Sequence, residues 1–284
     1  MNNYSKSNVQ NNVFQCAAVI VAAGSGSRAT DHDDLTSKKP SSIEPNVSIL
    51  TPHVRNTRLP AKQFWQLGSK MVLMHSFDYF IAHPRISMII LVLPDGQISY
   101  IRDLVTTSKK PVHYAIGGAT RQESVRAGLD MLAKISSCND IALVAIHDAA
   151  RPLIPSGLLD RLITAIETAT DPKIVGAVPV LALTDSIKTF EQDNKNNARF
   201  ITTGIDRDQL VATQTPQLFT RETITQLHRD FASKKTNFTD DCSLIEAARL
   251  RVLAIDGDKQ LMKLTDANDF AILEHLVTRT NASS

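Results

Sequence analysis

Glycines and charged residues lie where several apolar runs of this sequence end. The run "VIVAAGSGSRA" (19–29) leads into a glycine loop, which would let backbone N–H groups approach phosphate oxygens. A second pair, Gly117 and Gly118, precedes a helical pattern, and Asp148 follows the apolar run "IALVAIH". In open α/β sheets, ligands bind at the carboxyl ends of the strands. Together these residues predict a phosphate-binding site at one edge of a sheet.

The glycine loop alone fits more than one kind of site. Gly24, Gly26 and Ala29 match the dinucleotide fingerprint G-x-G-x-x-G/A, which would indicate an NAD-dependent dehydrogenase. That site needs a helix directly after the glycines and an acidic residue about 20 positions later. The sequence instead continues with "TDHDDLTSKKPSS", and Glu44 lies between prolines. A Walker A loop is excluded because no Gly-Lys-Ser/Thr follows, and a purely steric turn remains the simplest alternative.

Single residues of this set also have plain structural explanations. Lys62 in "LPAKQF" could be a solvated surface lysine, and Gly117–Gly118 could form an ordinary helix-entry turn. Asp148 is harder to explain in this way, because a carboxylate directly after a buried strand rarely lacks a partner or a task. The order of all these features along the chain is therefore more informative than any one of them.

The elements that would position these residues alternate between strands and helices. The apolar runs are rich in β-branched residues and nearly free of polar alternation, which indicates strands buried on both faces. We therefore predict an α/β fold that is Rossmann-like, with a mostly parallel sheet and helices on both faces. The predicted strands are 16–22, 86–94, 112–116, 141–147, 174–180 and 251–256, and the predicted helices are 71–82, 97–107, 121–135, 155–169, 220–233, 240–249 and 266–279.

Two segments interrupt this alternation within a chain that we interpret as one domain, 1–284. Residues 29–60 hold four prolines among polar residues without a period, which predicts a disordered insert. Residues 181–213 contain "DSIKTF" and "RFITTGI", separated by "EQDNKNNA", and this pattern predicts a projecting hairpin arm. Because an isolated two-stranded hairpin is marginal in water, we expect the arm to clasp a second copy of the chain in a homodimer.

Composition excludes several classes of protein. The 284 residues are 43% hydrophobic and 21% charged, and the net charge of +2 indicates neither nucleic acid nor a membrane surface as a partner. Three cysteines without CxxC spacing indicate neither a disulfide framework nor a zinc site. No apolar run reaches the ~18 residues of a membrane span, and the start of the chain resembles neither a signal nor a transit peptide. We expect a cytoplasmic protein.

The motifs, taken in order, are similar to those of one enzyme family. They are "AAGSGSR", "PAKQF", "GGATRQESV", "HDAARP", "LTDSIK", "DRDQLVATQTPQLF", "FTDDCSLIE" and "KLT", within residues 16–279. The first two occur in many nucleotidyltransferases, whereas the whole set resembles the 2-C-methyl-D-erythritol 4-phosphate cytidylyltransferase family. The resemblance implies the nucleotide-diphospho-sugar transferase type of fold. It also implies transfer of CMP from CTP to the methylerythritol phosphate, with Mg²⁺ and release of pyrophosphate, in the non-mevalonate isoprenoid pathway.

The resemblance implies a role for each matching residue. Arg28 and Lys62 would stabilise charge at the α-phosphorus, with Lys263 as a second phosphate-side lysine. Asp148 would meet CTP, the metal environment and the second substrate, and Mg²⁺ would be held mainly by the CTP phosphates. Catalysis would then consist of positioning and charge stabilisation without a covalent intermediate. The implied CTP-binding residues are Ala22, Ala23, Gly24, Gly117, Gly118, Ser124, Ala149 and Arg151, and Ala119 replaces an Asp common in the family.

The same comparison implies a site for the polyol phosphate. Ser186, Arg207 and Thr215 match residues that hold it from the neighbouring subunit, and Thr239 matches a contact within the same subunit. Ser186 stands where the family commonly has Thr, which keeps the hydroxyl.

Two further functions remain as alternatives. A ribitol-5-phosphate (or other polyol phosphate) cytidylyltransferase shares the glycine loop and the lysines, but such enzymes tend to have valine at the second alanine of "HDAARP". A non-catalytic nucleotide-sensing protein is disfavoured by the retention of Arg28, Lys62, Asp148 and Lys263. Because the sequence ends after its last predicted helix, we expect a monofunctional enzyme without a fused cyclodiphosphate synthase domain.

Overall fold

The computed structural model describes residues 14–24, 61–234 and 238–282. Arg28 and the whole of the predicted insert at 29–60 lie outside the described residues, so the disorder of the insert and the place of Arg28 stay predictions. No helix within the described ranges is long and apolar enough to cross a membrane.

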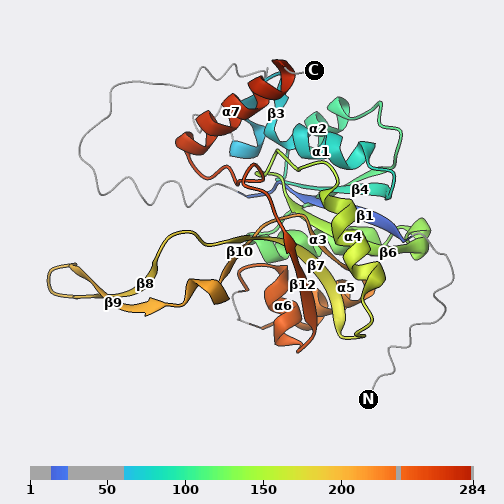
Figure 1. The fold of residues 1–284 in the computed structure, drawn as a ribbon. Coiled ribbons are helices and arrows are strands. Elements are labelled where there is room, and N and C mark those ends of the chain that lie inside the picture. Colours follow the sequence, from blue (N-terminus) through green and yellow to red (C-terminus); the bar gives the residue numbers. More distant parts are fainter. Residues whose placement is uncertain (1–13, 25–60, 235–237, 283–284) are drawn as a thin grey trace.

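An eight-stranded mixed sheet forms the centre of the molecule (Figure 1). Its order is β10-β7-β11-β6-β1-β4-β5, with β12 paired to β7. β1 pairs in parallel with β4 and β6, β4 with β5, and β7 with β12, whereas β10 and β11 run antiparallel to their neighbours. The strands are β1 (Gln15–Val21), β4 (Ile86–Leu93), β5 (Val112–Ile116), β6 (Ile141–Asp148), β7 (Ile174–Ala182), β10 (Val211–Thr213), β11 (Gln217–Thr220) and β12 (Arg251–Asp256).

Helices cover both faces of this sheet, as predicted. Side chains alternate along β1, so that Ala18 and Ile20 join one buried cluster while Ala17 and Val19 join the other. The first cluster packs under α1 (Val72–Ala82), α2 (Ile98–Leu104) and α4 (Leu158–Thr168). The second packs under α3 (Arg121–Ala133), α5 (Arg221–Asp230) and α6 (Asp241–Ala247). Each fully buried aliphatic side chain contributes about 1.5–3 kcal/mol of transfer free energy. The two clusters together therefore hold in place the strands that carry the site.

A smaller apolar cluster lies beside the main sheet. It joins α7 (Ala267–Ala282) to the two-stranded sheet of β2 (Gln66–Leu67) and β3 (Lys70–Met71) through Leu67, Leu273 and Val277. The 3₁₀ turn η3 (Lys62–Phe64) directly precedes β2. A second 3₁₀ turn, η4 (Ser136–Asp140), leads into β6.

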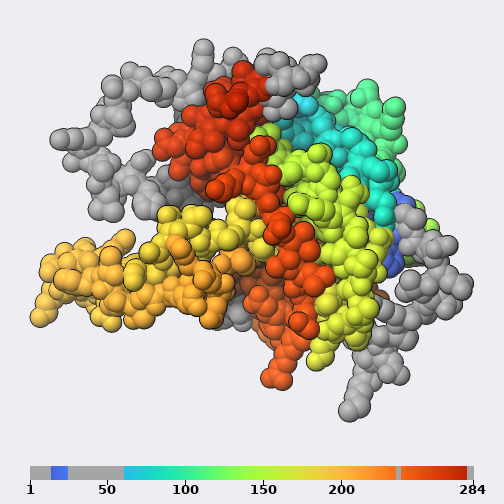
Figure 2. All heavy atoms as spheres, in the orientation of Figure 1, coloured from blue at the N-terminus to red at the C-terminus, as the bar shows by residue number. Residues whose placement is uncertain are grey.

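The predicted hairpin is present and projects from the body. β8 (Ile187–Gln192) pairs antiparallel with β9 (Arg199–Ile205), followed by the 3₁₀ turn η5 (Arg207–Gln209). Figures 1 and 2 show this hairpin standing clear of the helices. The two ends of residues 181–213 lie in the central sheet instead, because β7 extends to Ala182 and pairs there with β10.

Candidate active site

The residues singled out in the sequence meet at one edge of the central sheet. Val21 at the end of β1 is in register with Val92 of β4 and with Asp148 of β6. The glycine loop, which follows β1, therefore begins directly beside Asp148. The register of β4 with β5 places Gly117 next to the same edge, because Leu93 pairs with Ile116. The prediction that these motifs share the carboxyl ends of parallel strands is confirmed.

The two glycine segments touch each other. A Cβ atom added to Gly117 would lie 2.1 Å from the Cβ of Ala23, so a larger residue would force the segments apart. On the other side, the Gly118 N–H donates to Ser124 Oγ (3.1 Å), and Ser124 Oγ donates to the Thr120 carbonyl (2.9 Å). Ser124 is buried and shapes the Gly117–Gly118 segment through these bonds. The glycines thus permit a close approach and do more than make a turn.

A side chain next to Lys62 attaches its turn to the glycine loop. Gln63 Nε2 donates to the carbonyls of Ala22 (2.6 Å) and Gly24 (3.0 Å). This contact brings half-buried Lys62 to the loop across the long interval between them in the sequence. The Ala22 N–H is not open to a phosphate as the sequence suggested, because it donates to the Val92 carbonyl (2.8 Å) and continues the strand ladder.

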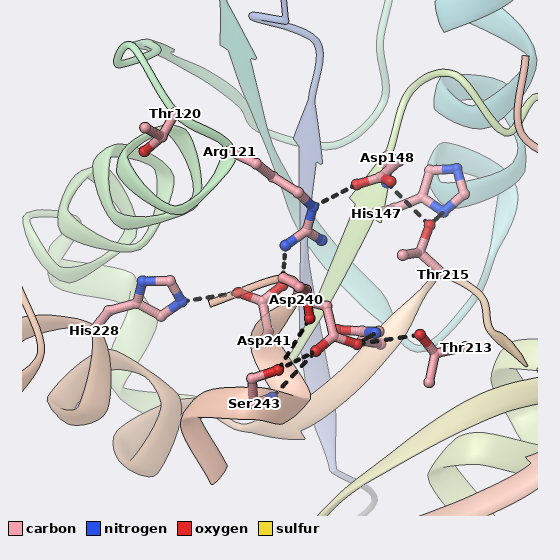
Figure 3. Close-up of polar contacts among 12 residues, drawn as sticks. Thr120, Arg121, His147, Asp148, Thr213, Thr215, His228, Asp240, Asp241 and Ser243 are labelled. Carbon is pink, nitrogen blue, oxygen red and sulfur yellow. Dashed lines mark hydrogen bonds and ion pairs between the residues drawn. The ribbon is translucent and has the colours of Figure 1, made fainter. Parts of the chain in front are cut away.

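Asp148 lies between two cations, of which Figure 3 shows Arg121. Its Oδ1 accepts from Arg121 Nε at 2.9 Å, and its Oδ2 accepts from Lys263 Nζ at 2.7 Å. Burial alone would raise the pKa of this carboxyl, but the two cations outweigh burial and hold its pKa well below the usual range. Asp148 is therefore a carboxylate at neutral pH, and it is in direct contact with Lys263, for which the family resemblance implied a separate role.

Arg121 and Asp241 belong to the same cluster, and sequence reasoning gave them no role. Arg121 Nη1 donates to Asp241 Oδ2 at 2.8 Å, and Asp241 Oδ1 lies 2.9 Å from His228 Nε2. Both residues fall inside quoted motifs, "GGATRQESV" and "FTDDCSLIE". The sequence did contain one signal for Arg121, because this arginine stands at the start of a predicted helix. A cation at that position interacts unfavourably with the helix dipole, so its presence indicates a role other than helix stability.

A second hydrogen-bond chain fixes the backbone of Asp148. His147 Nε2 lies 3.0 Å from the Arg151 carbonyl, which can only accept, so this nitrogen carries the proton. His147 Nδ1 then accepts from Thr215 Oγ1 (3.2 Å), and Thr215 Oγ1 accepts from the Asp148 N–H (3.1 Å). Thr215 is only 4% exposed and its hydroxyl is engaged within its own chain. The structure thus places Thr215 beneath Asp148, outside the projecting hairpin.

The neutral state of His147 makes stability depend on pH. Burial lowers the pKa of His147 from 6.5 to about 4. Between these values the unfolded chain binds more protons than the folded one, so the unfolding free energy falls as pH falls from 6.5 to about 4. We expect a loss of about 3 kcal/mol from this residue over that window. Denaturant unfolding at a series of pH values measures it.

The variant His147→Gln isolates this contribution. Glutamine keeps a donor and an acceptor but does not titrate, so the slope of unfolding free energy against pH should flatten, whatever its overall stability. An unchanged slope would show that other groups, such as His75 and His83, whose pKa values burial also lowers, carry the effect.

The segment after β6 holds the loop that carries Lys263. Arg151 Nη1 donates to the Leu261 carbonyl at 2.8 Å, and the Ala150 carbonyl accepts from the Leu264 N–H at 2.8 Å. The Ala149 N–H donates to the Val21 carbonyl (3.0 Å), which ties the ends of β6 and β1 together. Arg151 therefore positions the Lys263 loop, in addition to any contact with a nucleotide.

A family model described as IspD, 2-C-methyl-D-erythritol 4-phosphate cytidylyltransferase, matches residues 54–279. The chain belongs to this family. A bifunctional enzyme IspD/IspF of Rhizorhabdus wittichii is 37% identical over 224 residues, which are 77% of this chain and 53% of that protein. The chain spans about half the length of the curated relatives it matches.

Solved structures of the family share the fold. A 4-diphosphocytidyl-2C-methyl-D-erythritol synthase has a TM-score of 0.67 and 26% identity, covering 93% of this chain and 99% of that one. The 2-C-methyl-D-erythritol 4-phosphate cytidylyltransferase of Thermus thermophilus has a TM-score of 0.59 and 26% identity, covering 76% of this chain and 94% of that one. The recognition made from the ordered motifs is confirmed, as is the fold class.

Three other residues that the family resemblance implied, Ser186, Arg207 and Thr239, are exposed, whereas Asp148 is buried. Ser186 directly precedes β8, and Arg207 opens η5 and donates through Nη1 to the Thr184 carbonyl. Both are exposed. Thr239 is exposed before α6, with its Oγ1 3.3 Å from Ser243 Oγ.

Proposed function

We propose that this chain transfers the cytidylyl group of CTP to 2-C-methyl-D-erythritol 4-phosphate. A phosphate oxygen of the acceptor attacks the α-phosphorus, the bond from the α-phosphorus to the bridging oxygen breaks, and pyrophosphate leaves. The observation that supports this most is the junction of both glycine segments with Asp148, which is held between Arg121 and Lys263. A phosphoryl centre needs such convergent charge and positioning, with no covalent intermediate.

Each part of this edge has a distinct task in the proposal. The Gly117–Gly118 segment, shaped by Ser124, reads the cytosine edge, and the amides of Ala23 and Gly24 face the phosphates. Lys62 and Lys263 bring full positive charges to the α-phosphorus and the leaving group. Lys263 would exchange Asp148 for phosphate as CTP enters. Arg28, outside the described residues, keeps its predicted role beside Lys62, and Ala149 and Arg151 support the CTP site from the end of β6.

The donor set fits a magnesium ion that arrives with the nucleotide. Within the described residues there is no group of three or more His, Cys, Asp and Glu side chains that could hold a metal ion. Mg²⁺ at nucleotide sites is bound by one or two carboxylates, several waters and the substrate phosphates. Asp148 would supply the carboxylate once Lys263 has moved to the phosphates. When bound, the ion would neutralise charge on the phosphate oxygens.

A homodimer completes the acceptor site in this proposal. The hairpin exposes large apolar side chains, with Phe190 at 55%, Phe200 at 58% and Ile201 at 75% exposure. Such a patch on a projecting element is typical of an interaction surface. A second copy is the partner we propose, with Ser186 and Arg207 reaching its acceptor site. Thr239 serves the acceptor within one chain, and Thr215 contributes from beneath Asp148.

The decisive experiment follows pyrophosphate release. The protein is incubated with CTP and Mg²⁺ and either 2-C-methyl-D-erythritol 4-phosphate or ribitol 5-phosphate. The proposal expects release with the first acceptor and far less with the second. Release with ribitol 5-phosphate alone would favour the alternative cytidylyltransferase, and release with neither would overturn the proposed activity.

We predict that Arg207→Ala raises KM for the polyol phosphate far more than KM for CTP. Arg207 is an exposed guanidinium whose described contact is a single backbone carbonyl, so further donors can pair bidentately with a phosphate. Steady-state kinetics with each substrate varied in turn measures the two constants. Arg199→Ala is the matched control, because that arginine lies over the Phe190 ring in the same hairpin.

Mixed dimers test where Arg207 acts. If arms are exchanged between subunits, mixing Arg207→Ala with Lys62→Ala should restore part of the activity. Equal rises of both KM values, or no recovery in the mixture, would mean that Arg207 does not serve a partner's acceptor site.

A further inference from the structure

We propose that Asp241 is a positioning residue for the reaction: through Arg121 it holds the carboxylate of Asp148 in its working orientation. The inference rests on the proposed function for its kinetic consequence and on the described contacts for its geometry. Figure 3 shows Arg121 reaching from the start of α3 between the two carboxylates, with His228 beyond Asp241. Asp241 is 1% exposed, and its carboxylate bonds to Arg121 and His228, so we infer that its effect on Asp148 passes through Arg121.

The guanidinium of Arg121 is a bridge with fixed geometry. Its Nε binds Asp148 and its Nη1 binds Asp241, at 2.9 Å and 2.8 Å. A planar fork that is held at both ends cannot rotate without losing one charge-assisted bond. His228 Nε2 lies 2.9 Å from the other oxygen of Asp241, so the far end of the bridge is anchored on α5, which carries His228.

Stability alone does not explain this arrangement. Replacing a buried ion pair by well-packed apolar residues is often neutral or stabilising. Arg121 also stands in the first turn of α3, where a cation opposes the helix dipole. Its Nη2 is buried without a hydrogen-bond partner in the structure. A cluster that is unfavourable by each of these measures is understandable if it fixes the direction of a functional carboxylate.

The need for a second anchor arises during the proposed reaction. In the structure Lys263 holds Oδ2 of Asp148, but the proposed mechanism draws that lysine to the phosphates. Arg121 then remains as the cation that orients the carboxylate. If Asp241 did not balance and hold Arg121, the guanidinium would be free to follow the incoming phosphates as well.

The first test is the variant Asp241→Asn, which keeps the shape of the side chain and removes its charge. We expect kcat to fall roughly 10–100-fold, the range in which small misplacements of catalytic groups act. KM for CTP should change by less than about threefold, because no binding group is removed. Circular dichroism and thermal unfolding check the fold. Asp240→Asn is the matched control: Asp240 caps α6 and binds Thr213 and Gln217, so its loss should lower the melting temperature and leave kcat nearly unchanged.

A double-mutant cycle then tests whether Asp241 acts through Arg121. Once Arg121→Gln is present, adding Asp241→Asn should lower kcat no further, because contacting residues that act as one unit are not additive. Additive losses would overturn the inference, as would near-normal kcat in folded Asp241→Asn. If that variant does not fold, Arg121→Lys replaces it, since lysine keeps the charge but cannot bridge both carboxylates. Normal kcat in Arg121→Lys would equally overturn the inference.

One measurement is independent of the acceptor. The Nε–H group of Arg121 gives a ¹⁵N NMR signal that can be assigned by its absence in Arg121→Gln. In the wild type we expect the Nε–H proton to be protected from exchange with solvent. In Asp241→Asn we expect its signal to be broadened. Protection that survives in Asp241→Asn would overturn the positioning role, even for a protein with another polyol substrate. Failure of pyrophosphate release in the wild type would overturn the proposed function alone.

Discussion

Lys62→Ala is expected to lower kcat roughly 10²–10³-fold, the usual effect of removing one stabiliser of transition-state charge. Lys62 lies in the turn η3, which is attached to the glycine loop because neighbouring Gln63 donates to the carbonyls of Ala22 and Gly24. These bonds belong to Gln63, so the turn should keep its place when the lysine side chain is removed. The variant should therefore stay folded and lose turnover. Pyrophosphate release and circular dichroism measure the two quantities.

Lys70→Ala is the matched control for this prediction. Lys70 lies in β3, close to Lys62 in sequence, and its ammonium is paired with Asp78. Its removal should change kcat by no more than about threefold, as for an exposed ion pair. If Lys62→Ala kept near-normal turnover, the lysine would not face the reacting phosphorus. An equal loss in Lys70→Ala would indicate a general loss of positive charge.

Asp148→Asn is expected to lower kcat roughly 10²–10³-fold without raising KM for CTP. The amide removes a negative charge that the proposal needs at the second substrate and the metal. It also releases Lys263 and Arg121 from their ionic partner, and both cations can then attract the triphosphate more strongly. A fall in kcat with an unchanged or lower KM for CTP separates this role from simple nucleotide binding. Steady-state kinetics at saturating acceptor measures both constants.

The exposed pair of Asp171 and Arg251 provides the control. Asp171→Asn makes the same chemical change in an ion pair just before β7. Because β6 and β7 both pair antiparallel with β11, this ion pair lies at the edge of the sheet opposite Asp148, so kcat should not change. A strong rise of KM for CTP in Asp148→Asn would assign that carboxylate to nucleotide binding. Loss of the folded state would indicate that its ion pairs matter mainly for structure.

Local sequence patterns were sufficient for most of the fold. The long buried strands β1, β4 and β6 are continuous apolar runs, and amphipathic patterns marked every α-helix of the described residues. The strands β10 and β11 were missed because they have only three and four residues, too few for a period. β11 becomes a strand through its neighbours, since it lies antiparallel between β6 and β7 and buries Leu218 and Phe219.

Sequence motifs located the site but did not reveal its polar connections. The positions of Asp148, Lys263 and the glycine segments followed from strand ends and from the family resemblance. The bonds from Arg121 to Asp241 and from Gln63 to the glycine loop join residues 120 and about 40 positions apart. Only the packing of α3 against the sheet and the position of η3 beside the end of β1 bring them together. Thr215 shows the same limit, because its burial under Asp148 depends on the short strand that follows it.

The projecting hairpin leaves and re-enters the central sheet at adjacent points. Ala182 of β7 and Val211 of β10 are paired directly, so residues 183–210 form an excursion whose ends already meet. A segment of this kind can be shortened, extended or replaced while the strand order around it stays the same. In evolution, such a segment can be exchanged as one unit. In the proposed dimer, exchange of this segment alone would change which subunit is recognised and leave the geometry of the cluster around Asp148 intact.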